Sequence, residues 1–341
     1  MLRLPPIEFR APRTINEVLS ALASEEVRLV AGGTDLWPNM KRRHQQAKTV
    51  VSLMSVPGLS GIEHANGEVK VGATASLADI VRDEILRARF PAFARAVASI
   101  SSPPLRRMGT LGGNLCVDTR CNYYNQTQEW RCAIDYCLKE QGSICWVATK
   151  SPRCWAHSAS DSAPILCALG ARVKLVGKNG ERVIRVSELY RDDGIEYLHK
   201  QADEIITEVL LPADSDQDHC RSAFWKLRRR GSIDFSVFSV AAAVWTDDRK
   251  VVTHASLYLG AVGSSPVPVD IGALLVGKAL SEDLIIEAAH RAYKLARPMD
   301  NTDHAAAWRG KMARSYTHAA LNEIAGLPVR CAPPRHGLTV V

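Results

Sequence analysis

The chain has 341 residues, of which 46% are hydrophobic and 23% charged, and its formal net charge at pH 7 is +7. This length allows two or three domains, and the composition is that of a globular protein with a sizeable core. Apolar runs long enough for a membrane span or a secretory signal are absent, so we expect a cytoplasmic protein that does not enter a membrane. The basic runs at 41–43 and 226–230 lack interleaved aromatic residues and known nucleic-acid-binding motifs, so nucleic acid is not the expected partner.

Periodicity and capping signals predict three sections joined by turns and one polar linker, residues 213–219. Thr14, with Glu17 three residues later, is a typical start for a helix. Helices are expected over residues 15–23, 77–99 with a break at Pro91, 284–295 and 305–325. Strands are expected over residues 27–31, 50–53, 68–73, 171–176, 182–186, 205–211, 236–246 and 251–260. Asn179-Gly180 is predicted to turn the pair formed by 171–176 and 182–186.

Two glycine-rich turns, VAGGTDL at 30–36 and TLGGNLC at 110–116, adjoin apolar segments. Glycine lets backbone N–H groups approach a phosphate without a Cβ in the way, and threonine and asparagine add side-chain donors. One such turn is weak evidence, and neither matches the dinucleotide-binding pattern G-x-G-x-x-G. Two of them, about 80 residues apart, together predict a clamp for a diphosphate.

A cysteine-dense island, residues 119–157, interrupts an otherwise apolar domain, and seven of the nine cysteines lie between 116 and 167. In a cytoplasmic protein, clustered cysteines hold metal more often than they form disulfides. The residues alone support a Zn²⁺ site and an iron–sulfur cluster about equally, although the closely paired cysteines of zinc fingers are absent. Trp130, Trp146 and Trp155 either shield such a site or simply pack the loop, and His157 is expected to be solvated rather than a further ligand.

The motifs AGGTDL, GAT at 72–74, RRMGTLGGNLC, SASDSAPILCALGARVKLVG, SAFWKLRRRGSIDF and LYLGAVGSSPVPV resemble the FAD-binding subunit of the xanthine oxidase family of molybdenum enzymes over nearly the whole chain. The resemblance implies an α+β fold with two FAD-binding subdomains, residues 1–56 and 57–212, the second containing the island. A C-terminal α+β domain like that of the CO dehydrogenase flavoprotein is expected over 220–328. The FAD contacts that the resemblance implies are Leu29, Val30, Ala31, Gly32, Gly33, Thr34, Asp35, Leu36, Thr74, Thr110, Gly112, Gly113, Asn114, Asp161 and Lys226.

Within the family, the phrases CNYYNQ, YCLK and KSPRCW of the island are similar to the β subunit of 4-hydroxybenzoyl-CoA reductases. That similarity implies a [4Fe–4S] cluster in addition to FAD. Its four implied ligands exclude Cys116 and Cys132 and are separated by 15, 7 and 8 residues: Cys121, Cys137, Cys145 and Cys154.

The implied complex joins this chain to a large molybdopterin subunit and a small subunit with two [2Fe–2S] clusters, as a dimer of heterotrimers. Reduced ferredoxin would donate electrons for removing the phenolic hydroxyl of 4-hydroxybenzoyl-CoA on the molybdenum subunit, so no catalytic residue is expected here. One alternative is the FAD subunit of an oxidative hydroxylase that passes electrons outward to NAD or another acceptor. Another is a non-redox module whose zinc-stapled loop only binds partners.

Overall fold

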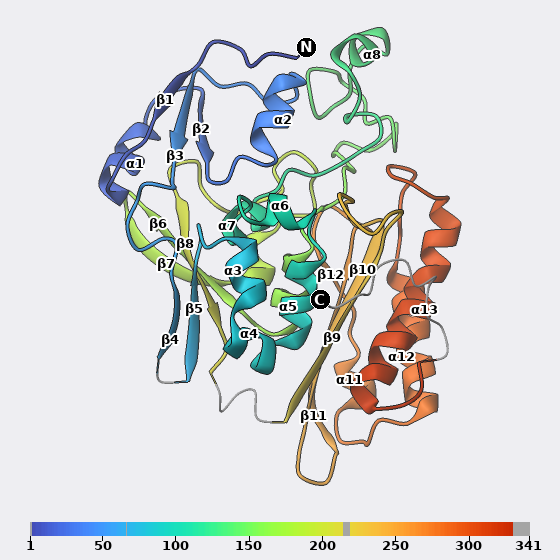
Figure 1. The fold of residues 1–341 in the computed structure, drawn as a ribbon. Helices are drawn as coiled ribbons and strands as arrows, with labels where there is room; N and C mark the ends of the chain where they lie inside the picture. The colour runs from blue at the N-terminus through green and yellow to red at the C-terminus, as the bar shows by residue number, and fades with distance from the viewer. Residues whose placement is uncertain (1, 66, 214–218, 330–341) are drawn as a thin grey trace.

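The computed structural model describes residues 2–65, 67–213 and 219–329 (Figure 1). The first section forms a parallel three-stranded sheet in the order β1-β3-β2, made of β1 (Glu8–Arg10), β3 (Thr49–Ser52) and β2 (Val27–Val30). Helix α1 (Ile15–Ala21) covers one face of this sheet and α2 (Leu36–Lys41) the other. The Thr14 hydroxyl accepts a hydrogen bond of 3.2 Å from the Glu17 N–H, which confirms the predicted start of α1.

The second section is built on an antiparallel five-stranded sheet with the order β4-β5-β8-β6-β7. Its strands are β4 (Ile62–Ala65), β5 (Glu68–Gly72), β8 (Ile205–Leu211), β6 (Arg172–Gly177) and β7 (Gly180–Arg185). The helix predicted over 77–99 is three helices, α3 (Leu77–Arg82), α4 (Glu84–Arg89) and α5 (Pro91–Ala98). The break at Pro91 is confirmed. A second break occurs because the Asp83 carboxylate caps α4, accepting from the Leu86 N–H at 2.8 Å.

Short helices complete this section: α6 (Pro103–Arg106), α7 (Leu111–Leu115), α8 (Gln128–Ala133), α9 (Ser162–Ala168) and a 3-10 turn at Val186–Leu189. In the third section an antiparallel sheet runs in the order β12-β11-β10-β9. It consists of β9 (Cys220–Leu227), β10 (Phe238–Thr246), β11 (Val252–Gly260) and β12 (Val267–Pro268), with helices α11 (Gly272–Leu275), α12 (Glu282–Leu295) and α13 (Ala306–Ala325). Of the predicted linker, residues 214–218 lie outside the described residues.

The strand β10 joins the second and third sections because both of its faces are buried. Val240, Ala242 and Val244 pack in the core with α12 and α13, whereas Ala241 and Ala243 belong to the core that contains α5 and α9. The small alanines let these helices lie close to the sheet. The result is a layered body of sheet, helices, sheet and helices (Figure 1). In the described parts of the chain, none of the helices combines the length and apolarity that a bilayer span requires.

The island is attached at its two ends, which meet in space. Arg120 and His157 form an isolated antiparallel bridge, with N–H to carbonyl distances of 2.9 and 2.8 Å. Between these ends the segment has its own small core, made of Cys121, Tyr124, Cys137, Cys154 and Ala156. The bridge explains how so long a segment interrupts the second section without separating the elements on either side of it.

The island docks on the C-terminal end of α2. The hydroxyl of Tyr124 donates to the carbonyl of His44 at 2.5 Å, and the His44 ring donates to the carbonyl of Gln126 at 3.0 Å. The buried Arg131 guanidinium donates to the carbonyl oxygens of residues 42 and 43 at 3.2–3.4 Å. A cation at the carbonyl end of a helix is electrostatically favourable. The island therefore fixes the end of α2 that lies away from the first glycine turn.

Lowering the pH is expected to loosen this docking. Burial lowers the pKa of His44 to about 4, and the charge of Arg131 adds to the shift. The unfolded chain, with an ordinary histidine pKa of about 6.5, takes up the proton first, so stability falls as the pH drops from about 6.5 towards 4. Hydrogen–deuterium exchange at residues 124–126, corrected for intrinsic rates, should rise from pH 7 to pH 5. His44→Gln should flatten this dependence, whereas His290→Gln on α12 should leave it unchanged. An equally steep rise in His44→Gln would contradict the assignment.

Candidate functional site

The first glycine turn connects the end of β2 to the start of α2 and needs both of its glycines. Gly33 has φ +70°, and a Cβ there would lie 2.1 Å from Nε1 of Trp37. A Cβ on Gly32 would lie 1.6 Å from the carbonyl oxygen of Met108, which precedes the second glycine turn. The N–H groups of residues 32–35 have no acceptor among the described residues. Four backbone donors are thus left for a ligand, beside the point where the two turns touch.

The second glycine turn is the short helix α7, which the sequence did not predict. The Thr110 hydroxyl caps it by accepting from the Gly113 N–H at 3.2 Å. The Gly112 N–H donates to the carbonyl of Ala73 at 2.8 Å, and the Asn114 N–H to the carbonyl of Thr110 at 2.9 Å. These three N–H groups are therefore used within the protein. The second turn therefore allows close approach to its backbone, whereas the N–H groups without an acceptor belong to the first turn.

Thr74 and Asn114 hold the wall of the site together. Thr74, next to Ala73, is buried and its N–H donates to the carbonyl of Leu59 at 2.7 Å. The side-chain oxygen of Asn114 accepts from the hydroxyl of Ser162 at 2.6 Å and from that of Ser160 at 3.0 Å. Asn114 thus fixes the N-terminal turn of α9 against α7. This places Asp161, between the two serines, beside the second glycine turn.

Asp161 and Lys226 form a buried ion pair at the start of α9. Their oxygen Oδ2 and nitrogen Nζ are 2.6 Å apart, and both side chains are less than 5% exposed. Burial raises the pKa of Asp161 and lowers that of Lys226, while their mutual attraction opposes both shifts. Lys226 also donates to the carbonyls of Ser99 and Asp234, so each of its three N–H bonds has an acceptor. The other Asp161 oxygen, Oδ1, has no partner among the described atoms.

Arg120, inside the island, reaches the first glycine turn, which sequence reasoning missed. Its guanidinium donates to Oδ1 of Asp35, whose Oδ2 accepts from the Asn39 amide at 2.8 Å. The same guanidinium carbon lies 4.4 Å from the centre of the Phe235 ring. Asp35 and Arg120 are far apart in the sequence. An aspartate or an arginine by itself does not indicate which residue it will pair with.

Four cysteines of the island are buried and line one pocket, and they are the four that the resemblance implied: Cys121, Cys137, Cys145 and Cys154. The other lining residues are mainly aromatic or aliphatic: Tyr123, Tyr124, Leu138, Lys139, Trp146, Val147 and Ala156. Cys132 is exposed on α8, and Cys116 lies outside the pocket. Across the described residues, however, no group of three or more His, Cys, Asp or Glu side chains is arranged so that it could hold a metal ion.

The island tryptophans and histidine have different surroundings. Trp146 lines the pocket, and its ring N–H donates to the carbonyl of Tyr136 at 2.6 Å. Trp130 is 39% exposed, and Trp155 lies under the guanidinium of Arg153. The expectation of a solvated His157 is wrong, because this residue is only 1% exposed and its Nδ1 contacts the carbonyl of Ser158. The backbone bridge to Arg120 holds His157 in the protein interior.

Backbone N–H groups near the pocket sulfurs oppose the rise in thiol pKa that burial causes. Burial raises the pKa of Cys121 to about 11, and the N–H groups of Tyr123 and Tyr124 oppose this shift. The N–H of Ala156 lies 3.4 Å from the Cys154 sulfur. Interaction with Cys154 and with backbone N–H groups lowers the pKa of Cys145 to about 5, whereas burial raises the pKa of Cys137, and Cys145 together with burial raises that of Cys154. The thiolate is the form of cysteine that binds metal, and Cys145 favours it most among the four.

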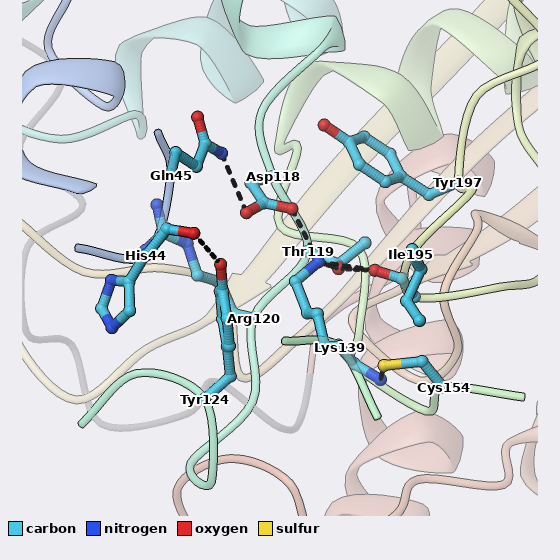
Figure 2. Close-up of polar contacts among 12 residues, drawn as sticks. His44, Gln45, Asp118, Thr119, Arg120, Tyr124, Lys139, Cys154, Ile195 and Tyr197 are labelled. Atoms are coloured by element: carbon cyan, nitrogen blue, oxygen red, sulfur yellow. Dashed lines mark hydrogen bonds and ion pairs between the residues drawn. The ribbon is translucent and has the colours of Figure 1, made fainter. Parts of the chain in front are cut away.

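A buried lysine joins this pocket to the first section (Figure 2). The ammonium of Lys139 donates to Asp118 at 2.7 Å, to the hydroxyl of Thr119 at 2.6 Å and to the carbonyl of Gly194 at 2.5 Å. Asp118 also accepts from the Gln45 amide at 3.0 Å. Burial alone would raise the pKa of Asp118, but Lys139, Gln45 and Arg120 together hold the pKa below its usual range. Sequence reasoning missed this network.

The chain is similar to several known proteins. The family described as the FAD binding domain in molybdopterin dehydrogenase matches residues 5–214, and the CO dehydrogenase flavoprotein C-terminal domain matches residues 222–324. The nicotinate dehydrogenase FAD-subunit of Eubacterium barkeri is 26% identical over 264 residues, 76% of each chain. The carbon monoxide dehydrogenase medium chain of Hydrogenophaga pseudoflava is 24% identical over 321 residues, 93% of this chain and 96% of that one.

Two solved structures share the fold. Carbon monoxide dehydrogenase from Hydrogenophaga pseudoflava superposes with a TM-score of 0.76 at 23% identity, over 97% of this chain and 100% of that chain. Quinoline 2-oxidoreductase from Pseudomonas putida 86 gives a TM-score of 0.74 at 21% identity, over 95% and 98% of the two chains. These likenesses confirm the predicted α+β, two-domain FAD-binding fold. Because the FAD-binding family covers more than half of the sequence and the flavoprotein C-terminal domain covers most of the remainder, this chain belongs to the FAD-binding subunits of the xanthine oxidase family of molybdenum enzymes.

Proposed function

We propose that this chain is the electron-transfer subunit of a molybdenum enzyme and carries both FAD and a [4Fe–4S] cluster. The observation that carries the proposal is the single pocket lined by the four implied cysteines, with Cys116 and Cys132 outside it. A flavin, when bound, exchanges electrons one or two at a time, and a cluster exchanges them singly. The protein's part is to hold the two groups at defined places and keep water away from them.

The residues present fit FAD. The unpaired N–H groups of residues 32–35 suit a diphosphate, because backbone amides of a glycine turn bind anions. The unpaired oxygen of Asp161 is a buried acceptor that a ligand N–H or O–H would satisfy, and leaving it unpaired would cost about 1–3 kcal/mol. Because Lys226 has no free N–H, we assign it to positioning Asp161 rather than to direct contact. The other proposed contacts are residues 29–36, Thr74, Thr110, Gly112, Gly113 and Asn114.

The donor chemistry of the island pocket supports an iron–sulfur cluster, although its four cysteines are not arranged to hold a single metal ion. Four cysteine thiolates are the usual ligand set of such clusters. Apolar walls from Leu138, Trp146 and Val147 limit access of water, and backbone N–H groups face the sulfurs. Both features are known to tune cluster potential. The proposed ligands remain Cys121, Cys137, Cys145 and Cys154.

The proposed reaction is the reductive dehydroxylation of 4-hydroxybenzoyl-CoA to benzoyl-CoA on a partner subunit. Replacing the hydroxyl with hydrogen and releasing water consumes two electrons and two protons, which reduced ferredoxin and solvent would supply. The island supports this assignment through its similarity to the reductase β subunits. The proposed partners are a large molybdopterin subunit and a small [2Fe–2S] subunit, in a dimer of heterotrimers.

The names of the relatives favour a second candidate, an oxidative hydroxylase that passes electrons outward. The matched proteins include a nicotinate dehydrogenase subunit, a caffeine dehydrogenase subunit and a nicotine 6-hydroxylase subunit. Turnover by the purified complex separates the two candidates. Benzoyl-CoA formation from 4-hydroxybenzoyl-CoA with a low-potential reductant supports the reductase, and its absence together with reduction of an acceptor by a hydroxylatable substrate supports the hydroxylase.

Replacing Gly33 should remove FAD. In Gly33→Val the side chain would collide with Trp37, and the residue would occupy a positive φ that valine strongly disfavours, so the free amides would move. Gly58→Val is the matched control, because Gly58 has a similar φ of +82° but lies in open space away from the turn. The FAD content per chain after gel filtration is the measurement. Full FAD content in Gly33→Val, at unchanged thermal stability, would refute the proposed clamp.

Replacing Cys145 should remove the cluster. Cys145→Ala deletes one of four proposed iron ligands, whereas the exposed Cys132→Ala should keep full iron and sulfide content. FAD should stay in both variants, because the bridge between Arg120 and His157 does not depend on the pocket. Iron, sulfide, zinc and flavin analyses of each purified protein show which cysteines the metal site requires and which metal it holds. Zinc without sulfide in the wild-type protein would support the stapled loop, and iron loss in Cys132→Ala alone would overturn the ligand set.

A further inference from the structure

We infer that Arg120 neutralises the Asp35 carboxylate beside the first glycine turn, so that the cysteine-bearing island also sets the affinity of the flavin site. The inference rests on the proposed function, in which residues 32–35 bind the FAD diphosphate. Arg120 would be a positioning residue, since it acts through Asp35 and not by touching the cofactor.

Arg120 and Asp35 form a hydrogen-bonded ion pair. The Asp35 carboxylate belongs to the same turn as the free N–H groups, and one of its oxygens accepts from the Arg120 guanidinium. Asn39 supplies the other hydrogen bond to Asp35 and also lies 3.4 Å from the guanidinium. The Arg120 side chain is 8% exposed and that of Asp35 is 32% exposed. A pair shielded in this way is screened less by salt than a surface pair.

The charges make Arg120 necessary for an anionic ligand. Burial raises the pKa of Asp35, Arg120 opposes this shift, and the nearby Asp118 adds to it. The neighbouring carboxylate of Asp118 already has its own cation in Lys139. Without Arg120, the Asp35 carboxylate would stand uncompensated next to a diphosphate that carries two negative charges. Two negative charges that lie close together in a partly buried site repel each other strongly.

The backbone explains why Arg120 can be changed without dismantling the cysteine pocket. Both hydrogen bonds of the bridge to His157 come from backbone atoms, and so does the start of the turn that carries Cys121. The side chain of Arg120 points instead to Asp35, Asn39 and the ring of Phe235. Iron content can therefore serve as an internal monitor of the island's fold.

The test is a rescue experiment in the full chain within its native assembly. Arg120→Met should raise the dissociation constant for FAD by at least about tenfold, as expected for an uncompensated charge near a dianion. Arg120→Met/Asp35→Asn should recover most of this loss, because the repelling carboxylate is gone. Arg120→Lys, which keeps the charge, should stay close to wild type. Arg153→Met is the control, since within the described part of the chain the contacts of Arg153 are with Asp192, Trp155 and Ser151 and none is with the first glycine turn.

Release of flavin, followed by fluorescence on dilution, measures the FAD affinity, and iron analysis accompanies each variant. An unchanged FAD affinity in Arg120→Met, or a double variant no better than the single one, would overturn the inference. So would a loss in Arg120→Lys equal to that in Arg120→Met. If Arg120→Met does not fold, Arg120→Gln against Arg120→Lys makes the same comparison. A wild-type protein that binds no FAD would instead refute the proposed function, so the two failures are distinguishable.

Discussion

The backbone of the first section touches that of the second where Gly32 meets the carbonyl of Met108. A Cβ at this position would lie 1.6 Å from the carbonyl oxygen, so glycine alone permits the contact. Through it, the turn that ends β2 and the turn that begins α7 form one surface, although they belong to different sections of the chain. Gly112 in the second glycine turn packs on Ala73 in the same way, because a Cβ on Gly112 would lie 2.9 Å from the Ala73 carbonyl oxygen. The candidate FAD site is in this sense built from backbone, and the side chains around it mainly hold that backbone in place.

The side chains that do so are buried and charged, which is costly unless every group is paired. Lys226 satisfies all its donors with Asp161 and two carbonyls, and Lys139 does the same with Asp118, Thr119 and the carbonyl of residue 194. Buried ion pairs contribute little net stability but disfavour alternative arrangements that would separate the charges. Here each pair joins elements distant in sequence. Rigidity of the candidate site follows from the high cost of opening these pairs.

The island contacts the first and the third sections of the molecule through polar groups. Arg120 reaches Asp35 at the start of α2, while Tyr124 and Arg131 hold the carbonyls at its other end. On the opposite side, the Asn301 amide donates to the carbonyl of Trp155 at 2.6 Å. An inserted segment with a core of only a few side chains has little stability of its own. These contacts with the surrounding protein, more than its own packing, keep the four cysteines around one pocket.

The sequence by itself determined the features that a few neighbouring residues control. The strand at 205–211 was predicted with its observed bounds, Thr14 capped the first helix, and Pro91 broke the helical run, because alternation, capping and proline act locally. The grouping of the four cysteines also followed from sequence, through resemblance to a family.

Only the tertiary structure decided what depends on docking between distant segments. It paired Asp35 with Arg120, buried His157, and used the N–H groups of the second glycine turn inside α7. None of these has a local signal, since a side chain's partner and exposure depend on which other element packs against it. The sequence therefore specified the pieces of the candidate site, and the packing of three sections and an island specified which atoms remain free to bind.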